Sequence, residues 1–386
     1  MDGKLFIIAQ VFLDINRRCT VNRSVNEILI SYKRHFDEVH YVGPSAEEFT
    51  RMQGISDNIY LSSLTCYGKQ SYNRLTYYMK YPAVKRRFGE IINSGPADIV
   101  QLRIPSLFSM GVYPIVRKLG LPLTTYIAGD WRTSFTSNYH FPGSNLVVKG
   151  LDRLQQSIIK NSVAVTAGPI LARQYAELTN CHPYFSTTHN KVFSRKSRFP
   201  PSNLLFVGRL EPIKRLCDAI EAVGLLKKQG VNVRLTVVGD GVMREQLEKI
   251  VKAQELVDRI FFKGQIDDSK LLKQVYLASD ILVLPSISEG TPKVLAEAMA
   301  YGVVPIAITG TGSNDFIIKD GHNGFLTPPK SPKAIVQTIR MLRSSQETYE
   351  QVVIHGYEYA KKHTLDREVD KLWNFVFSRL GKKGID

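Results

Sequence analysis

Short apolar runs alternate along the chain with longer segments whose apolar residues recur at helical spacing. In the first half, strand-like runs span 5–12, 38–42, 99–102, 123–127 and 163–166. In the second half, they span 204–207, 234–238, 259–262, 281–284 and 304–307, with amphipathic segments such as 218–229 and 241–254 between them. Strands that alternate with helices predict parallel sheets joined by right-handed crossovers. Two such series predict an α/β protein of two doubly wound domains.

The domain boundary is predicted from breaks in this pattern. The segment 194–202 (SRKSRFPPS) has two prolines among small and basic residues, which suit neither helix nor strand. The segment 349–379 is helical in pattern, and its aromatic residues near the end must be buried against another element. We therefore expect an N-terminal domain of residues 1–195, a second domain of residues 196–355, and a terminal helical segment, 356–386, that packs back on the first.

Composition narrows the class of protein. Apolar residues make up 44% of the 386 residues, which predicts a packed globular fold. The run 4–11 is too short for a membrane span and lacks a cleavage pattern, so it is interpreted as a buried strand and not a signal peptide. The four cysteines are scattered, without metal-type spacing. This favours a reducing compartment, and we expect the protein in the cytoplasm.

The positive charge is concentrated in the first half. Residues 1–198 hold 25 Lys and Arg against 13 Asp and Glu, a net of +12, out of +16 for the chain. The segment 77–88 (YYMKYPAVKRRF) combines Lys80, Lys85, Arg86 and Arg87 with aromatic residues. Anionic lipid head groups, a phosphorylated substrate or nucleic acid would each fit this segment, and so would a solvated basic surface.

The strongest chemical signal is the segment 285–300 (PSISEGTPKVLAEAMA), which follows the apolar run 281–284 and leads into a helical pattern. A loop at the carboxyl end of a parallel strand that opens a helix is where α/β folds bind anions, and it suits a diphosphate. Glu289 lies in the loop, and Glu297 follows about two helical turns later. One carboxylate can then reach sugar hydroxyls and the other ribose hydroxyls. The alternative is an acid that favours the helix dipole and an exposed helical Glu.

Cations are predicted for the neighbouring loop. The stretch 208–214 (GRLEPIK) follows the apolar run 204–207 and places Arg209 and Lys214 in a strand-to-helix loop. Arginine offers a planar fork and lysine a compact charge, so both suit a leaving diphosphate. A third loop, 238–241 (VGDG), predicts a tight turn, and a fourth offers backbone groups of Gln265 and Ile266 to a nucleobase.

At this point the chain resembles a known family. The strings FVGRLEPIKR, VVGDG, FFKGQI, ASDILVLPS, EGTPKVLAEAMA and GHNGFLTPP resemble the retaining glycosyltransferases of family four. The resemblance covers about residues 203–345, and its most specific part is the Glu-x7-Glu spacing of Glu289 and Glu297. It implies the GT-B fold, in which two Rossmann-like domains face a central cleft and a C-terminal helix crosses back to the N-terminal domain.

The resemblance also implies roles for residues. Arg209 and Lys214 would bind the diphosphate, Glu289 the donor sugar and Glu297 the ribose. Backbone groups near Glu289 would contact sugar and phosphate, namely those of Gly290, Thr291, Val294 and Leu295. Glu289, Asp130, Arg209 and Lys214 are the residues we expect to act in catalysis.

The N-terminal half departs from the family pattern. The stretch 14–26 has no Gly-Gly loop, and Arg17, Arg18 or Arg23 would supply donors in its place. Asp130 stands where relatives carry a histidine; it would be a polar group near the donor sugar, an acceptor-side base, or the cap of the following helix. Gln101 and Arg103 end another strand and would face the same site. A role for His189, before the interdomain linker, is left open.

No metal or further cofactor is expected. The pair at 267–268 (DD) is interpreted as a helix start and not as a metal-binding Asp-x-Asp pair. Retention without an evident nucleophile then favours front-face attack, in which the leaving phosphate takes the acceptor proton.

The sequence thus predicts an enzyme, a hexosyltransferase. It would move a sugar from a nucleotide diphosphate donor, UDP before GDP, to a glycan or lipid-linked glycan in polysaccharide or glycolipid synthesis. We expect peripheral contact with an anionic membrane at its cytoplasmic face and no nucleic-acid partner. The alternatives are a nucleotide-sugar epimerase, a glycosyl phosphorylase, or a non-catalytic protein that binds membrane or nucleic acid.

Overall fold

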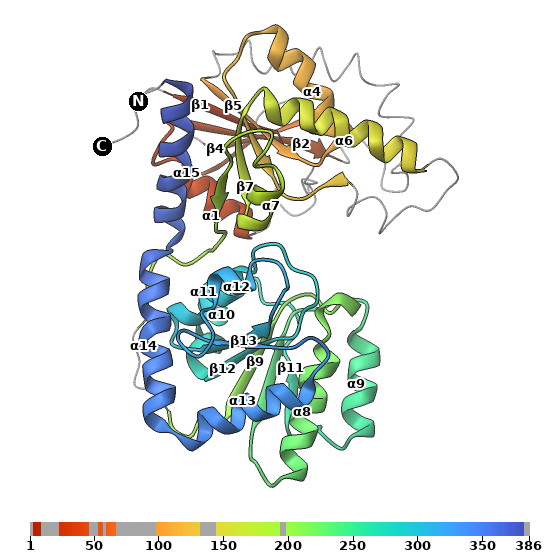
Figure 1. Ribbon diagram of the computed structural model, residues 1–386, viewed down its shortest axis with the longest axis vertical. Helices are drawn as coiled ribbons and strands as arrows, with labels where there is room; N and C mark the ends of the chain where they lie inside the picture. Colours follow the sequence, from red (N-terminus) through yellow and green to blue (C-terminus); the bar gives the residue numbers. More distant parts are fainter. Residues whose placement is uncertain are drawn as a thin grey trace. The chain divides into compact units, whose positions relative to one another are not determined.

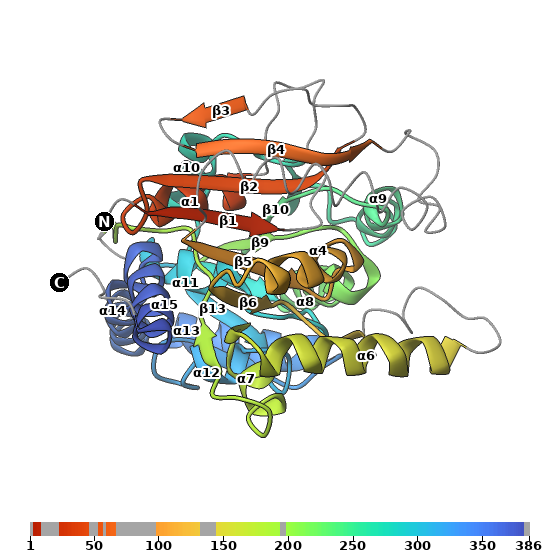
Figure 2. The same cartoon turned by 90° about the horizontal axis from the view of Figure 1, so that it is seen from above.

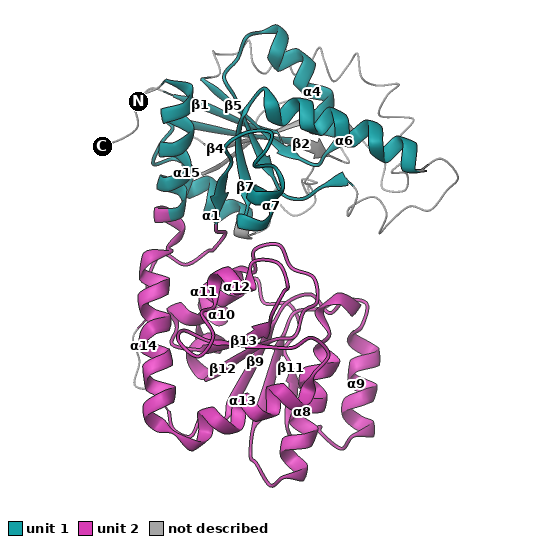
Figure 3. Cartoon of the chain, viewed as in Figure 1, with its two compact units in different colours: residues 1–184, 368–386 teal, residues 185–367 magenta. Residues whose placement is uncertain are grey.

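The computed structural model of the chain describes residues 3–8, 23–45, 53–56, 59–66, 98–131, 144–193 and 198–381. Two compact units divide it, residues 1–184 with 368–386 and residues 185–367 (Figure 3). The units therefore change at 184/185 and 367/368, where the sequence predicted changes at 195/196 and 355/356. Residues 185–193 belong to unit 2 because their backbone and side chains bond within it, as in the 2.7 Å hydrogen bond from Phe193 N to Ala300 O.

Unit 1 is built on an eight-stranded sheet with the order β3-β4-β2-β1-β5-β6-β7-β8 (Figure 1). Its strands pair in parallel except β3 with β4. The strands are β1 (Lys4–Ile8), β2 (Glu38–Ser45), β3 (Gln53–Ser56), β4 (Ile59–Cys66), β5 (Ile99–Ile104), β6 (Leu123–Ile127), β7 (Val163–Ala167) and β8 (His182–Tyr184). The described helices are α1 (Arg23–Tyr32), α4 (Leu107–Lys118), α6 (Ser144–Lys160) and α7 (Pro169–Gln174).

Two helical layers cover this sheet. Helices α4 and α6 pack through Phe108, Val112 and Ile158 on the face that carries Val100 and Leu102 of β5. On the opposite face, Tyr32 of α1 lies beside Gln101 of β5 and packs against Trp373 of the last helix, α15 (Leu365–Leu380).

Helix α15 completes the core of unit 1. Trp373 is fully buried and meets the rings of Tyr32 and Phe36 edge-on, with centroids 5.1 and 4.6 Å away. The predicted aromatic face of the C-terminal segment is therefore buried in the first unit, from Glu368 onward.

Unit 2 is built on a six-stranded parallel sheet with the order β11-β10-β9-β12-β13-β14. The strands are β9 (Asn203–Val207), β10 (Arg234–Val238), β11 (Ile260–Phe262), β12 (Ile281–Leu284), β13 (Val304–Ile308) and β14 (Phe325–Thr327). Its helices are the 3₁₀ helix η1 (Pro212–Lys214), α8 (Leu216–Lys228), α9 (Arg244–Ala253), α10 (Ser269–Ala278), α11 (Lys293–Ala300), α12 (Asn314–Ile317), α13 (Pro332–Ser344) and α14 (Gln346–Lys362).

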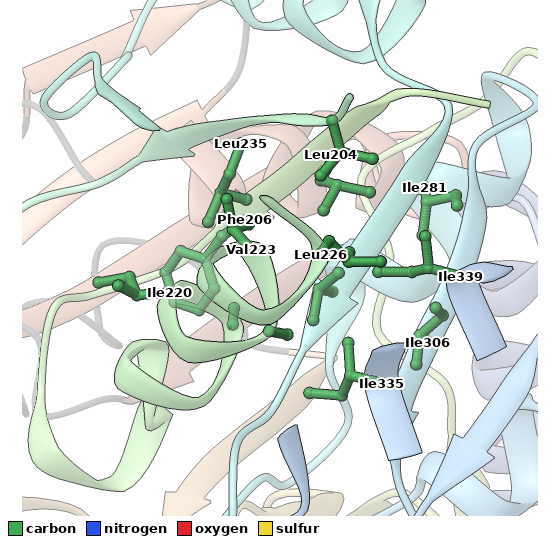
Figure 4. Packing of buried hydrophobic residues seen from close by; sticks show 14 of the residues in the cluster. Leu204, Phe206, Ile220, Val223, Leu226, Leu235, Ile281, Ile306, Ile335 and Ile339 are labelled. Atoms are coloured by element: carbon green, nitrogen blue, oxygen red, sulfur yellow. The ribbon is translucent and has the colours of Figure 1, made fainter. Parts of the chain in front are cut away.

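The core of unit 2 follows from the apolar runs of the sequence. Alternate strand residues such as Leu204, Phe206 and Ile281 meet the apolar faces of α8 and α13 (Figure 4). Burying such side chains contributes about 1.5–3 kcal/mol each, as an upper estimate. The sheet therefore holds its carboxyl edge rigidly, and the loops at that edge are the ones singled out by the sequence.

Most strands occur where the apolar pattern predicts them. Strands β6, β10 and β12 have the predicted bounds, and Asp268 caps α10 by accepting hydrogen bonds from Lys270 N and Leu271 N. Strands β3, β4, β8 and β14 were not predicted. Strands β3, β8 and β14 are the last strands of their sheets, where a neighbour on one side only demands fewer apolar residues, and β4 is next to last. Within the described part of the chain, no helix is long and apolar enough to cross a membrane.

Candidate donor site in unit 2

Three loops of unit 2 meet at the carboxyl edge of β9, β12 and β13, which are neighbours in the sheet. The loop after β12 is joined to the loop after β9 by the 3.0 Å hydrogen bond from Ile287 N to Ile213 O. It is joined to the loop after β13 by the 2.9 Å hydrogen bond from Ser313 N to Gly290 O. The predicted glutamate loop is therefore held on both sides by backbone contacts.

Close approach of these loops requires Gly312. Its φ of +52° lies in the left-handed region, and a Cβ atom built there would lie 2.1 Å from Glu289 O. Any side chain would push the loop after β13 away from Glu289.

The same requirement recurs beside β10. A Cβ on Gly239, at φ +128°, would lie 1.9 Å from Gly208 O. The predicted tight turn after β10 is thus locked against the loop that begins at Gly208.

Lys214 and Glu289 form an ion pair between two of these loops. Lys214 Nζ lies 2.7 Å from Glu289 Oε1, and the side chains are only 14% and 10% exposed. Lys214 ends η1, and the next residue, Arg215, adopts a left-handed φ of +46° and grips Asp218 with both Nε and Nη2, at 2.7 and 2.6 Å. This bidentate fork fixes the turn that presents Lys214.

The second predicted cation does not reach this pair. Arg209 is 74% exposed, and its Nη1 lies 2.6 Å from Glu211 Oε1. The predicted convergence of Arg209 and Lys214 is therefore not seen in this structure: Lys214 pairs with Glu289, whereas Arg209 is an exposed group with a local partner. An exposed arginine keeps the conformational freedom to turn toward a ligand phosphate.

Glu297 lies on α11 and is held by two hydroxyl groups. It is 9% exposed, and its Oε2 accepts a 2.9 Å hydrogen bond from Tyr276 OH. Its Oε1 accepts a hydrogen bond from Thr188 Oγ1. Each carboxylate oxygen has a further lone pair, so Glu297 can accept more hydroxyl groups in a fixed orientation.

An aromatic stack fixes the hydroxyl of Tyr276. The ring of Tyr276 is stacked on Tyr301 with centroids 5.1 Å apart, and Tyr301 is stacked on Phe193 at 5.0 Å. Lys273 Nζ lies 3.7 Å from the centroid of the Phe193 ring, in cation–π contact. The carboxylate of Glu297 is thus oriented by groups that are themselves packed.

The remaining predicted donor-site residues differ in what they can offer. A Cβ on Gly290 would meet nothing within 4 Å, so its backbone borders open space. Thr291 Oγ1 lies 3.5 Å from Ser313 Oγ, and Val294 is half-buried. The side chain of Leu295 is fully buried in the core, so only its backbone is available.

The predicted nucleobase loop is exposed at one position. Gln265 is exposed, and its Nε2 donates to Asp267 Oδ1 over 2.8 Å. Ile266 packs against the core cluster that contains Tyr276.

The residues of unit 1 that the sequence singled out differ in how exposed they are. Asp130 directly precedes the helical residue Trp131 and is half-buried. Arg103 is exposed and lies over the ring of Tyr126, 5.3 Å from its centroid. Gln101 was expected to face the site with Arg103, but it is buried beside Tyr32 of α1. Gln101 and Arg103 are two positions apart, so their side chains lie on the same face of β5. They differ in exposure because Arg103 is nearer the carboxyl end of the strand.

His189 has a structural role. Its Nε2 donates to Ala360 O over 2.9 Å, and its Nδ1 accepts from Thr187 Oγ1 over 2.6 Å. Burial lowers the pKa of His189 below its usual 6.5, so the ring is neutral and both nitrogens are used. Arg17, Arg18 and the basic segment 77–88 lie outside the described residues, as does the side chain of Arg23.

Sequence reasoning missed three residues that support the site. Thr188 and Tyr276 orient Glu297, and Asp218 anchors the turn before Lys214. Thr188 is 109 positions from Glu297, so no local spacing links them. The acid three residues after Arg215 is a signal that could have been noticed, because i and i+3 side chains meet on a helix.

Comparison with known proteins identifies the class. Residues 190–359 match the family of glycosyl transferases group 1. The sulfoquinovosyl transferase of Arabidopsis thaliana is 24% identical over 373 residues, which cover 90% of this chain and 70% of that protein. A Campylobacter jejuni relative is 28% identical over 207 residues, 53% of this chain and 55% of that protein. Its name is GalNAc-alpha-(1->4)-GalNAc-alpha-(1->3)-diNAcBac-PP-undecaprenol alpha-1,4-N-acetyl-D-galactosaminyltransferase.

A solved structure shares the fold of this chain. The structure of Anabaena HepE in complex with UDP and glucose aligns with a TM-score of 0.69 at 15% identity, over 98% of this chain and all of that one. The architecture is therefore GT-B, as predicted. The family match of residues 190–359 and the relatives named as glycosyltransferases make the protein an enzyme of the glycosyltransferase class. Residues 190–359 carry the similarity to glycosyl transferases group 1, and they span less than half of the chain.

Proposed function

We propose that the chain is a retaining hexosyltransferase that moves a sugar from a nucleotide diphosphate to a hydroxyl of a glycan or lipid-linked glycan. The ion pair between Lys214 and Glu289 carries this proposal. It brings a cation for phosphate and a carboxylate for sugar hydroxyls within 2.7 Å of each other at the carboxyl edge of β9 and β12. A sugar diphosphate needs both groups side by side, because its hydroxyls and its phosphates are joined at the anomeric carbon.

Glu297 supplies the ribose contact in this proposal. Its two oxygens are oriented by Tyr276 and Thr188, and each can still accept a ligand hydroxyl. Ribose offers two vicinal hydroxyls, which suit a carboxylate held in one orientation. Arg209 would turn from Glu211 to the diphosphate when the donor binds.

The reaction we propose is a front-face displacement. The acceptor oxygen bonds to the anomeric carbon as the carbon–phosphate oxygen bond breaks, and the acceptor proton passes to the leaving phosphate. Lys214 and Arg209 stabilise the negative charge that develops on the diphosphate. No metal enters this scheme, and addition of EDTA should leave the rate unchanged. If a sugar covalently bound to Glu289 or Asp130 were trapped, the mechanism would be a double displacement and not a front-face displacement.

Donor and acceptor are proposed on the chemistry of relatives. UDP is favoured as the nucleotide, with GDP second, because HepE, which shares the fold, holds UDP and glucose. A lipid-linked acceptor is favoured by the undecaprenol in the name of the Campylobacter relative. Polysaccharide or glycolipid synthesis at the cytoplasmic face of a membrane would use such an acceptor.

A thermal-shift screen of UDP-, GDP- and ADP-sugars tests the donor site. A ligand present at about 100 times its Kd stabilises the folded protein by about 2.7 kcal/mol. Glu297→Gln should abolish the shift, whereas Asp130→Asn should retain most of it. Equal loss in both variants would contradict the assignment of Glu297 to the nucleotide.

Two product analyses separate the alternatives. With donor and no acceptor, an epimerase converts the sugar nucleotide, whereas a transferase leaves it intact apart from slow hydrolysis. With an acceptor, the anomeric proton coupling of the first product reports retention or inversion directly.

A further inference from the structure

The outward face of α6 carries apolar side chains that the fold of unit 1 does not use. Leu146 is 75% exposed, Val147 44% and Leu154 41%. Leu146 and Leu154 are eight residues apart, with Gly150 midway, so they form one stripe along the helix. The opposite face of the same helix, with Val148, Ile158 and Ile159, is already packed in the core.

A basic stripe runs beside the apolar one. Lys149 and Arg153 are four residues apart, and Lys160 continues the row; all three are exposed. The acid of this helix, Asp152, is buried on the inward face, where Gln156 Nε2 donates to it over 3.2 Å. The exposed face therefore has an apolar half and a cationic half.

We propose that this face of α6 adsorbs to an anionic lipid bilayer, with Leu146, Val147 and Leu154 entering the head-group boundary. Lys149, Arg153 and Lys160 would contact the lipid phosphates. An amphipathic helix with one apolar and one basic strip is suited to lie in the plane of a membrane interface. The net charge of +12 on residues 1–198 attracts the same surface over a longer range.

A bilayer fits this patch better than a protein does. Three apolar side chains fall short of the roughly 800 Å² that each partner buries in a stable protein interface. Membrane adsorption needs less apolar area because the anionic surface adds its attraction for each nearby Lys or Arg.

The patch also lies at the correct end of the sheet. Helix α6 follows β6 and leads to β7, so in a parallel crossover its first turn starts near the carboxyl edge of the sheet. Figures 1 and 2 show the first turns of α6 projecting beyond the strands of unit 1. Arg103 and Asp130 lie at the same edge. The inference deepens the proposed function, since a lipid-linked acceptor would be met at this edge.

Sedimentation with vesicles tests the proposal and needs neither donor nor acceptor, so its result is independent of the transfer assay. The intact protein should bind vesicles of phosphatidylcholine mixed with phosphatidylglycerol and not vesicles of phosphatidylcholine alone. The double variant Leu146→Glu, Leu154→Glu should bind at least about tenfold more weakly. Lys149→Gln with Arg153→Gln should weaken binding about fivefold per charge at low salt.

Matched controls come from unit 2. Val257, an exposed apolar residue between Glu255 and Asp258, gives Val257→Glu, and Lys249, exposed on α9 beside Glu245, gives Lys249→Gln. Both should bind vesicles as the unchanged protein does.

A gain-of-signal variant guards against misfolding. Both native tryptophans, Trp131 and Trp373, are buried. Leu146→Trp should therefore report the patch through a blue shift of its emission with anionic vesicles only.

Three results would overturn the proposal. The first is unchanged binding of the Leu146→Glu, Leu154→Glu variant. The second is an emission of Leu146→Trp that anionic vesicles leave unshifted. The third is a change of oligomeric state in that double variant without vesicles, which would assign the face to a second copy of the chain.

Discussion

The carboxyl edges of the two sheets are built differently. In unit 2, the functional side chains contact one another or packed neighbours: Lys214 meets Glu289, and Glu297 meets Tyr276. In unit 1, Arg103 rests on the ring of Tyr126, and the residues beside it turn into the interior. Among the described residues, the edge of unit 2 holds side chains that are paired or oriented by neighbours, whereas the candidate residues at the edge of unit 1 are the exposed Arg103 and the half-buried Asp130.

The proposed function accounts for this difference by what each edge would recognise. A nucleotide diphosphate sugar has the same anionic core in every donor, so a rigid arrangement of charges lowers the cost of binding it. Acceptors vary in sugar and in carrier, and no fixed pair of charges serves them all. We therefore expect substitutions at the edge of unit 2 to have larger and more uniform effects.

The largest expected effect is at Lys214. Lys214→Met removes the cation beside Glu289 and should lower kcat/KM by about 100- to 1,000-fold, or about 3–4 kcal/mol of transition-state stabilisation. Arg209→Met should cost much less, because Arg209 is 74% exposed and has to turn toward the ligand. Steady-state kinetics with saturating acceptor measure both. Similar losses in the two variants would mean that the ion pair is not the organising feature.

Next comes the glycine that holds the loops together. Gly312→Ala places a Cβ against Glu289 O and should lower the free energy of unfolding by about 2–3 kcal/mol, with loss of donor binding. Gly310 is the matched control: its φ is +69°, but a Cβ there meets nothing within 4 Å. Gly310→Ala should cost only the backbone strain, about 1 kcal/mol. Urea unfolding of both variants separates the contact from the strain.

The third largest effect is expected at the two hydroxyl groups that donate hydrogen bonds to Glu297. Tyr276→Phe and Thr188→Val each leave one carboxylate oxygen without its donor and should weaken donor binding by about 1–2 kcal/mol, seen in KM more than in kcat. Thr188→Ser keeps the hydroxyl and should restore binding. In unit 1, Tyr184 OH is buried and has no partner among the described residues, so Tyr184→Phe should be neutral or stabilising. A KM unaffected by Tyr276→Phe would remove the orienting role.

The smallest effect concerns pH. Burial lowers the pKa of His189 in the folded protein, while the unfolded chain binds a proton near pH 6.5, so stability falls as the pH drops below about 6.5. His189→Gln should flatten this dependence and cost some stability at neutral pH through its imperfect hydrogen bonds. Two other histidines, the buried His40 and the half-buried His182, have lowered pKa values too, so only the difference between variant and unchanged protein is diagnostic. Denaturant unfolding from about pH 7.5 to 5.5 measures it.

The sequence predicted unit 2 closely because its site is local. Glu289, Gly290 and Glu297 belong to one loop and one helix, and Lys214 lies in the loop after the apolar run 204–207 of β9. A periodic pattern and a short spacing are enough to place such residues. The exact partners were not predictable, since Thr188 reaches Glu297 only after the fold brings distant segments together.

Unit 1 was less predictable for a physical reason. Gln101 and Arg103 have the same parity on β5, yet one is buried under α1 and the other is exposed. Their fate depends on where Tyr32 and α15 pack, and that is set by residues more than 200 positions away. The boundary before the terminal helix also differs from the predicted one, 367/368 in place of 355/356. The reason is that the packing of this helix, and not its composition, determines the unit to which it belongs.

The placement of α15 has a consequence for synthesis. Unit 2 is complete when residue 367 has left the ribosome, whereas unit 1 still lacks the helix that carries Trp373. Until α15 has been synthesised, Tyr32 and Phe36 lack the Trp373 ring that packs against them, so the core of unit 1 is incomplete. We therefore expect unit 2 to fold before unit 1, the reverse of the usual order in which the earlier domain folds first during synthesis.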